Sequence, residues 1–180
     1  MKEIEVKARL KNKDEVMKKL ESLGCVFEKP ITQSDVVYAK KVGSFKEYDS
    51  NEVFLRVRVK NNSKIIFTAK QRIKNGLDKL ENETEVTNKK GIEGILAMLG
   101  YKEGTRVNKT LRTAHYQAYE ICIDEIEELG SFIEMESLVE DGDSEKIQEE
   151  MFKFLASLGV NSKDRVFLGY DLQILKAKEG

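Results

Sequence analysis

Alternation of charged and apolar residues is the main pattern of this sequence. The first ten residues place charged side chains at Glu3, Glu5, Lys7 and Arg9, with an apolar side chain after each. A period of two is the period of a β-strand, so the charged side chains should share one strand face. The pattern recurs in four later sets: Arg56/Arg58/Lys60, Lys70/Arg72, Glu81/Glu83/Glu85 and Glu134/Glu136. The sequence therefore predicts a sheet with one ionic face.

The same periodicity and the turn residues place the remaining elements. About eight strands are predicted, over residues 1–11, 25–41 (extended chain interrupted by Pro30), 52–60, 64–72, 79–87, 101–113, 116–124 and 131–139. Asn61-Asn62 and Asn75-Gly76 are typical hairpin turns, and residues 42–51 have the composition of a loop. Apolar residues at helical spacing predict helices from Asn12 or Asp14 to Leu23, over 90–99 and over 145–158.

These elements predict one α+β domain over residues 1–180, because no stretch rich in Gly, Ser or Pro divides the chain. A closed eight-stranded antiparallel β-barrel with flanking helices is the expected architecture, since closure removes the edges that so many strands would expose.

Composition excludes several classes of protein. Charged residues make up 35% of the chain, and Lys plus Arg (31) almost balance Asp plus Glu (32). A net charge of −1 argues against a general nucleic-acid binder. Two cysteines without a CxxC motif, no long apolar run and no signal peptide indicate a cytoplasmic protein with no membrane partner. We interpret Cys25 and Cys122 as buried or half-buried thiols and His115 as exposed.

The ionic face has two interpretations. It can be the solvated exterior of a sheet, where Glu, Lys and Arg are common. It can instead line an interior, and the separation of sign between strands favours this reading. Arg56 and Arg58 make one strand face basic, whereas Glu134 and Glu136 make another acidic. Like charges two residues apart repel, so such faces suit a polyanion together with the divalent metal that accompanies it.

Six motifs, in order, resemble those of the CYTH superfamily, the triphosphate tunnel metalloenzymes. They are Glu3-Ile4-Glu5-Val6-Lys7, Gln33-Ser34-Asp35 with Tyr38, Phe54-Leu55-Arg56-Val57-Arg58, Thr68-Ala69-Lys70, Glu83-Thr84-Glu85, and Ile123-Asp124 followed by Glu134-Met135-Glu136. The resemblance extends over essentially the whole chain. It implies an antiparallel tunnel that binds a triphosphate compound with Mg²⁺ or Mn²⁺.

The resemblance also implies roles for residues at matching positions. Phosphate oxygens would be bound by Lys7, Arg56, Arg58 and Lys70, of which the first three are also the catalytic candidates. The metal candidates are Glu3, Glu5, Glu134, Glu136 and Asp124, with Glu83 and Glu85 as further candidates. On the sixth strand the family commonly carries K-x-R, but here Leu111 occupies the arginine position. Either Lys109 alone binds phosphate, or a bulge also brings Arg112 to the tunnel.

Within the superfamily, the length and the segment Gly169-Tyr170-Asp171-Leu172 resemble the class IV adenylate cyclase-like branch. The resemblance implies conversion of ATP to cyclic AMP and pyrophosphate. The alternatives are a triphosphatase acting on thiamine triphosphate, inorganic tripolyphosphate or a nucleoside triphosphate, and a polyphosphate-binding module without turnover. Resemblance to this branch also implies a homodimer, whereas the residues themselves indicate no oligomeric state.

Overall fold

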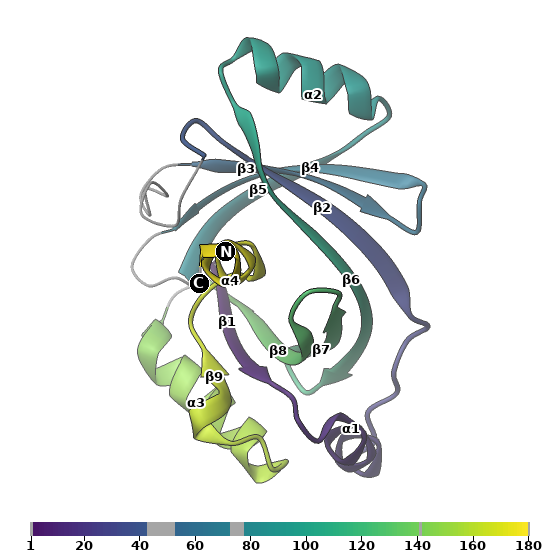
Figure 1. Cartoon of the computed structure of the whole chain (residues 1–180). Helices are drawn as coiled ribbons and strands as arrows, with labels where there is room; N and C mark the ends of the chain where they lie inside the picture. Colours follow the sequence, from purple (N-terminus) through teal and green to yellow (C-terminus); the bar gives the residue numbers. More distant parts are fainter. Residues whose placement is uncertain (1, 43–52, 73–77, 141, 180) are drawn as a thin grey trace. The chain divides into compact units, whose positions relative to one another are not determined.

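The computed structural model describes residues 2–42, 53–72, 78–140 and 142–179. In this part of the chain it contains nine strands and four α-helices (Figure 1). Their packing separates the chain into two compact units, residues 1–31 with 110–167 and residues 32–109 with 168–180. All strand pairs with a determined register in either unit are antiparallel.

The first unit contains strands β1 (Lys2–Arg9), β7 (Tyr119–Ile126), β8 (Gly130–Val139) and β9 (Arg165–Val166), in the order β7-β8-β1-β9. The later part of β6 (Lys102–Tyr116) lies beside β7. Its helices are α1 (Lys13–Ser22) and α3 (Ser144–Ser157).

One face of this sheet is apolar and packs against the two helices. Ile4 and Val6 of β1 are fully buried with Leu20 of α1 and with Met151 and Leu155 of α3. Because side chains alternate along β1, this contact fixes Glu3, Glu5 and Lys7 on the opposite face.

The second unit contains β2 (Ile31–Ala39), β3 (Phe54–Lys60), β4 (Lys64–Arg72) and β5 (Asp78–Val86), in the order β5-β4-β3-β2, with the first part of β6 beside β2. Its helices are α2 (Lys89–Met98) and α4 (Tyr170–Glu179). Val36, Leu55 and Val57 pack with Leu96 of α2, so Asp35, Arg56 and Arg58 occupy the other face of the sheet.

Most predicted elements are confirmed within a few residues. Asn61 and Asn62 have φ of 48° and 58°, the left-handed conformation that a two-residue hairpin turn requires. The predicted Asn75-Gly76 turn and almost all of the predicted 42–51 loop lie outside the described residues. Cys25 and Cys122 are buried and His115 is exposed, as predicted.

Three predictions were wrong or incomplete. Strand β6 continues to Tyr116, and the chain turns at Gln117, which has φ of 54°. Helix α4 and the two-residue strand β9 were not predicted. The α+β class and the antiparallel sheet are confirmed, but closure of the strands into a barrel is not confirmed. The single domain over 1–180 and the cytoplasmic location stay predictions.

None of the helices in the described part of the chain is long and apolar enough to cross a membrane.

Candidate functional site

Strands β1 and β8 bring acidic residues together in the first unit. Their register places Glu5 directly opposite Glu136 and Lys7 directly opposite Glu134. Residues in such cross-strand pairs have Cβ atoms about 5 Å apart, so two glutamates in one pair repel each other. Glu3 lies two residues before Glu5 on the same face and adds a third negative charge.

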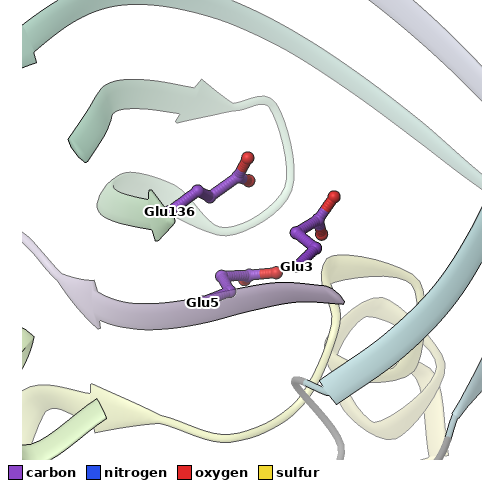
Figure 2. A group of neighbouring side chains, drawn as sticks. All are labelled: Glu3, Glu5 and Glu136. Carbon is purple, nitrogen blue, oxygen red and sulfur yellow. The ribbon is translucent and has the colours of Figure 1, made fainter. Parts of the chain in front are cut away.

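The carboxylates of Glu3, Glu5 and Glu136 converge. Each offers an oxygen, and these oxygens all lie within 4.8 Å of one another. Figure 2 shows the three side chains reaching the same region from β1 and β8. An octahedral Mg²⁺ with bonds of about 2.1 Å bridges oxygens up to about 4.2 Å apart. Carboxylate oxygens are the ligands that Mg²⁺ and Mn²⁺ prefer. The donor chemistry of the three residues therefore fits a divalent metal, and their oxygens would move slightly closer together to hold it.

Lys7 lies beside this group and holds two carboxylates. Its Nζ is 2.6 Å from Glu134 Oε1 and 2.8 Å from Glu5 Oε1, and the side chain is 3% exposed. Burial alone lowers the pKa of a lysine, but the nearby charges of Glu134 and Glu5 outweigh it and raise the pKa of Lys7 above its ordinary value. Lys7 is therefore a fixed cation that offsets part of the negative charge.

Helix α3 supports the segment of β1 that carries the candidate metal ligands. Gln148 is buried, and its Nε2 donates a hydrogen bond of 3.1 Å to the main-chain oxygen of Glu5. This bond ties the strand backbone to a helix whose other buried residues are mainly apolar.

Asp124 of β7 is fully buried, and it lies opposite Phe132 of β8. It is two residues from Cys122, which lies opposite Glu134. Asp124 thus shares the charged face with Glu134, but neither belongs to the group of three converging carboxylates among the described residues.

In the second unit, Arg58 is held by a carboxylate on the neighbouring strand. It lies directly opposite Asp35 of β2. Its Nε and Nη2 donate to the two carboxylate oxygens of Asp35, both at 2.7 Å. Burial would raise the pKa of Asp35, but Arg58 outweighs burial and lowers it. Arg58 and Asp35 thus form a bidentate, nearly buried ion pair with fixed geometry.

Arg56 and Lys70 share another carboxylate, Glu81 of β5. Arg56 Nη2 is 3.1 Å from Glu81 Oε1 and 3.2 Å from Thr68 Oγ1, and Lys70 Nζ contacts Glu81 Oε2. Arg56 Nε is buried and has no hydrogen-bond partner among the residues the structure describes. Burial and the neighbouring charge of Arg58 lower the pKa of Arg56. An anion bound beside Arg56 would raise this pKa again, because its charge is opposite to that of the guanidinium.

Glu83 and Glu85, the further metal candidates, are exposed and do not belong to the three converging carboxylates among the described residues. Glu83 Oε2 is 4.0 Å from Arg56 Nη2, and its side chain is half exposed. Glu85 forms an exposed ion pair with Lys64. Glu81, which sequence reasoning left without a role, pairs with Lys70 across the β4–β5 register. Its signal was the acidic alternation of Glu81, Glu83 and Glu85, but only the register shows which of the three faces Lys70.

Lys109 and Arg112 of β6 have different surroundings. Lys109 Nζ lies 5.3 Å from the centre of the Tyr170 ring, and its charge acts on Asp35. Arg112 lies over the Phe27 ring, and its Nε donates to the main-chain oxygen of Glu28. It is two residues from Ala114 of the apolar core, so strand alternation puts it on the core face. The structure does not bring Arg112 to the charged face.

Comparison with known proteins agrees with these motifs and this geometry. The sequence model of the CYTH domain matches residues 1–170. The chain therefore belongs to the CYTH family, as its motifs predicted.

Two archaeal proteins are similar over nearly their full length. A Methanocaldococcus jannaschii protein named "putative adenylate cyclase" is 29% identical over 166 residues, which cover 91% of this chain and 93% of that protein. The structure of the PH1819 protein from Pyrococcus horikoshii has a TM-score of 0.80 at 27% identity, and the match covers 97% of this chain and 99% of that one.

A plant protein shares the fold. The Hippeastrum protein HpAC1 is described as an adenylyl cyclase candidate with a dominant triphosphatase activity. Its structure has a TM-score of 0.65 at 17% identity, and the match covers 98% of this chain and 96% of that one. At this identity the likeness shows the fold alone.

Proposed function

We propose that this protein is an enzyme that acts on a triphosphate compound with the help of Mg²⁺ or Mn²⁺. The observation that carries the proposal is the convergence of Glu3, Glu5 and Glu136 on the charged face of one unit, while Arg56, Arg58 and Lys70 gather on the charged face of the other. A triphosphate and a divalent metal are the counter-charges that these two groups need.

In this proposal Glu3, Glu5 and Glu136 hold the metal. When bound, the metal neutralises charge on phosphate oxygens and lowers the pKa of a coordinated nucleophile. Lys7 orients Glu5 and Glu134 through its two ion pairs and offers its charge to a phosphate oxygen. Asp124 and Glu134 remain further candidates for the metal, since both lie on the same face.

Arg56, Arg58 and Lys70 bind the phosphate groups. Arg56 has a buried Nε without a partner among the described residues, so it can accept an anion without first losing a hydrogen bond at that atom. Arg58 is oriented by Asp35, and Lys70 by Glu81. Such preorganised cations stabilise the charge that moves between phosphate oxygens in the transition state.

The closed tunnel typical of this family stays part of the proposal because of the resemblance, and Lys109 is a further candidate for binding phosphate. A homodimer remains a proposal that rests on the resemblance alone.

We propose the cyclase reaction as the finer activity, supported by the name of the Methanocaldococcus jannaschii relative. The 3′-hydroxyl oxygen of ATP bonds to the α-phosphorus, the bond from that phosphorus to the bridging oxygen breaks, and pyrophosphate leaves. The hydroxyl proton passes to solvent. The alternative is hydrolysis, in which water attacks the terminal phosphorus, and the name of the Hippeastrum protein favours it.

Product analysis tests the proposal. Purified protein is incubated with Mg²⁺ or Mn²⁺ and ATP, thiamine triphosphate or tripolyphosphate, and cyclic AMP, pyrophosphate and orthophosphate are measured. Cyclic AMP with equimolar pyrophosphate supports the cyclase, and orthophosphate alone supports the triphosphatase. Tight binding without any product contradicts an enzyme and supports the binding module. Arg56→Ala should abolish product formation, whereas Arg106→Ala, which removes an exposed arginine paired with Glu103, should not.

A further inference from the structure

Gln33 of β2 has a buried acceptor atom that the protein itself does not satisfy. The side chain is 6% exposed, and its Oε1 has no hydrogen-bond partner among the residues the structure describes. Buried amide oxygens almost always accept a hydrogen bond, because leaving one unpaired is unfavourable. An exception therefore needs an explanation, and a missing ligand is one.

The position of Gln33 connects it to the cationic group. Thr32 and Ser34 on either side are exposed, whereas Gln33 and Asp35 are buried, so strand alternation puts these two on one face. The register pairs Gln33 with Lys60 and Asp35 with Arg58. Residues two apart on one strand face are about 7 Å apart. The Gln33–Lys60 pair is therefore the next pair on this sheet face after the Asp35–Arg58 ion pair.

The charges around Gln33 limit the donor that it can accept. Lys60 lies opposite, and Arg58 is the next basic residue on the same strand face. Burial and then the charge of Arg58 lower the pKa of Lys60, whereas Glu83 raises it, so Lys60 and Arg58 repel each other along β3. An ammonium group on the ligand would add to that repulsion. A neutral N–H donor would not, and an amino group on an aromatic heterocycle is such a donor at neutral pH.

We propose that Gln33 recognises the organic part of the triphosphate substrate by accepting a hydrogen bond from an amino group on an aromatic heterocycle. The inference rests on the proposed function, because it assigns the phosphate groups to Arg56, Arg58 and Lys70. It narrows the substrate class to triphosphates that carry an amino-substituted heterocycle, and it excludes bare tripolyphosphate as the preferred ligand.

The test combines a change in the protein with a change in the ligand. Gln33→Met keeps the length of the side chain and removes the acceptor. Calorimetric titration compares ATP, purine riboside triphosphate, which lacks the amino group, and tripolyphosphate. The unchanged protein should bind ATP about tenfold more tightly than purine riboside triphosphate, the effect of one hydrogen bond. In Gln33→Met the two should bind equally, and tripolyphosphate affinity should change less than about twofold.

Thr105→Val supplies the matched control. Thr105 is also buried in the second unit with a hydroxyl oxygen that lacks a partner among the described residues. It lies four residues before Lys109 on β6, about 13 Å along the strand. Each substitution removes a polar atom that has no partner among the described residues, so each should leave the melting temperature of the ligand-free protein unchanged or raise it. Only Gln33→Met should change the preference for ATP.

Other outcomes would overturn the inference. Equal loss of ATP and tripolyphosphate affinity in Gln33→Met would make Gln33 a phosphate-binding or structural residue. An unchanged preference for ATP over purine riboside triphosphate would show that it does not contact the amino group. A clear fall in melting temperature would show that the amide group of Gln33 has a structural role within the protein. If the unchanged protein binds no triphosphate at all, the proposed function itself fails.

Discussion

The charged faces of the two units are built by the same alternation, yet they prepare opposite charges. On β1 and β8, four carboxylates (Glu3, Glu5, Glu134 and Glu136) lie beside the cation Lys7, which pairs with Glu5 and Glu134. On β3 and β4, three cations (Arg56, Arg58 and Lys70) contact the carboxylates of Asp35 and Glu81, and Glu83 lies 4.0 Å from Arg56. The acidic group attracts a cation and the basic group attracts an anion. The comparison indicates that the sign of the charges on each face, and not the strand pattern that places them, determines what that face can bind.

The largest expected effect concerns stability on the basic face. Arg58→Ala should lower the free energy of unfolding by about 3–5 kcal/mol, because it leaves Asp35 buried without its partner. Urea denaturation measures the change. Replacing both residues, as in Asp35→Leu with Arg58→Met, should restore most of the stability. Equal losses in the single and double variants would show that the ion pair has no special role.

The next effect concerns triphosphate affinity. Arg56→Ala should weaken metal-free binding of tripolyphosphate about 100-fold, since charge-assisted hydrogen bonds to phosphate are lost. Stability should fall much less than in Arg58→Ala, because Glu81 keeps its contact with Lys70. Calorimetric titration gives the affinity, with Arg106→Ala as the control. A variant that binds as tightly as the unchanged protein would remove Arg56 from the site.

A smaller effect is expected on the acidic face. Glu136→Gln should weaken Mn²⁺ binding at least about tenfold, because it removes one of three converging carboxylates. The metal-free protein should melt at the same or a higher temperature, since repulsion from Glu5 falls. Mn²⁺ titration followed by electron paramagnetic resonance measures the affinity. Glu128→Gln, which changes an exposed residue of the β7–β8 turn, should leave it unchanged.

The smallest effect depends on pH. Arg58 lowers the pKa of Asp35 below its ordinary value of 3.8. The stability from this pair is present above pH 3.8 and is lost as the pH falls through the lower, folded-state pKa. Urea denaturation between pH 6 and pH 2 should show this loss in the unchanged protein. Asp35→Asn should be less stable at pH 6, and its stability should fall less with acid. Parallel curves would contradict the assigned pairing.

Much of this fold follows from local sequence, because one-sided apolar alternation and hairpin turn residues are local signals. The Asn61-Asn62 turn and the core face of β1 were predicted for that reason. The β6–β7 boundary was missed, since Gln117 is not a usual turn residue. Helix α4 was missed because polar Asp171 and Gln173 are buried beside Leu172 and Ile174, which hides the apolar stripe.

The candidate residues were also predicted from alternation, but their pairing was not. Which glutamate meets Lys70 depends on the register of β4 and β5, and that register depends on packing of the whole unit. Lys7 was expected to contact phosphate, whereas the structure gives its ammonium two carboxylate partners. Arg112 could have been excluded as a phosphate ligand from the sequence. It lies three residues after Lys109, and residues three apart on a regular strand face opposite sides.

One measurement tests the division between the two faces most directly. Mn²⁺ affinity and metal-free tripolyphosphate affinity are measured for Glu136→Gln and for Arg56→Ala under the same conditions. We predict that Glu136→Gln loses Mn²⁺ binding and keeps tripolyphosphate binding, whereas Arg56→Ala shows the reverse. If either substitution weakens both affinities equally while the protein stays folded, the two faces do not have separate roles and the account is wrong.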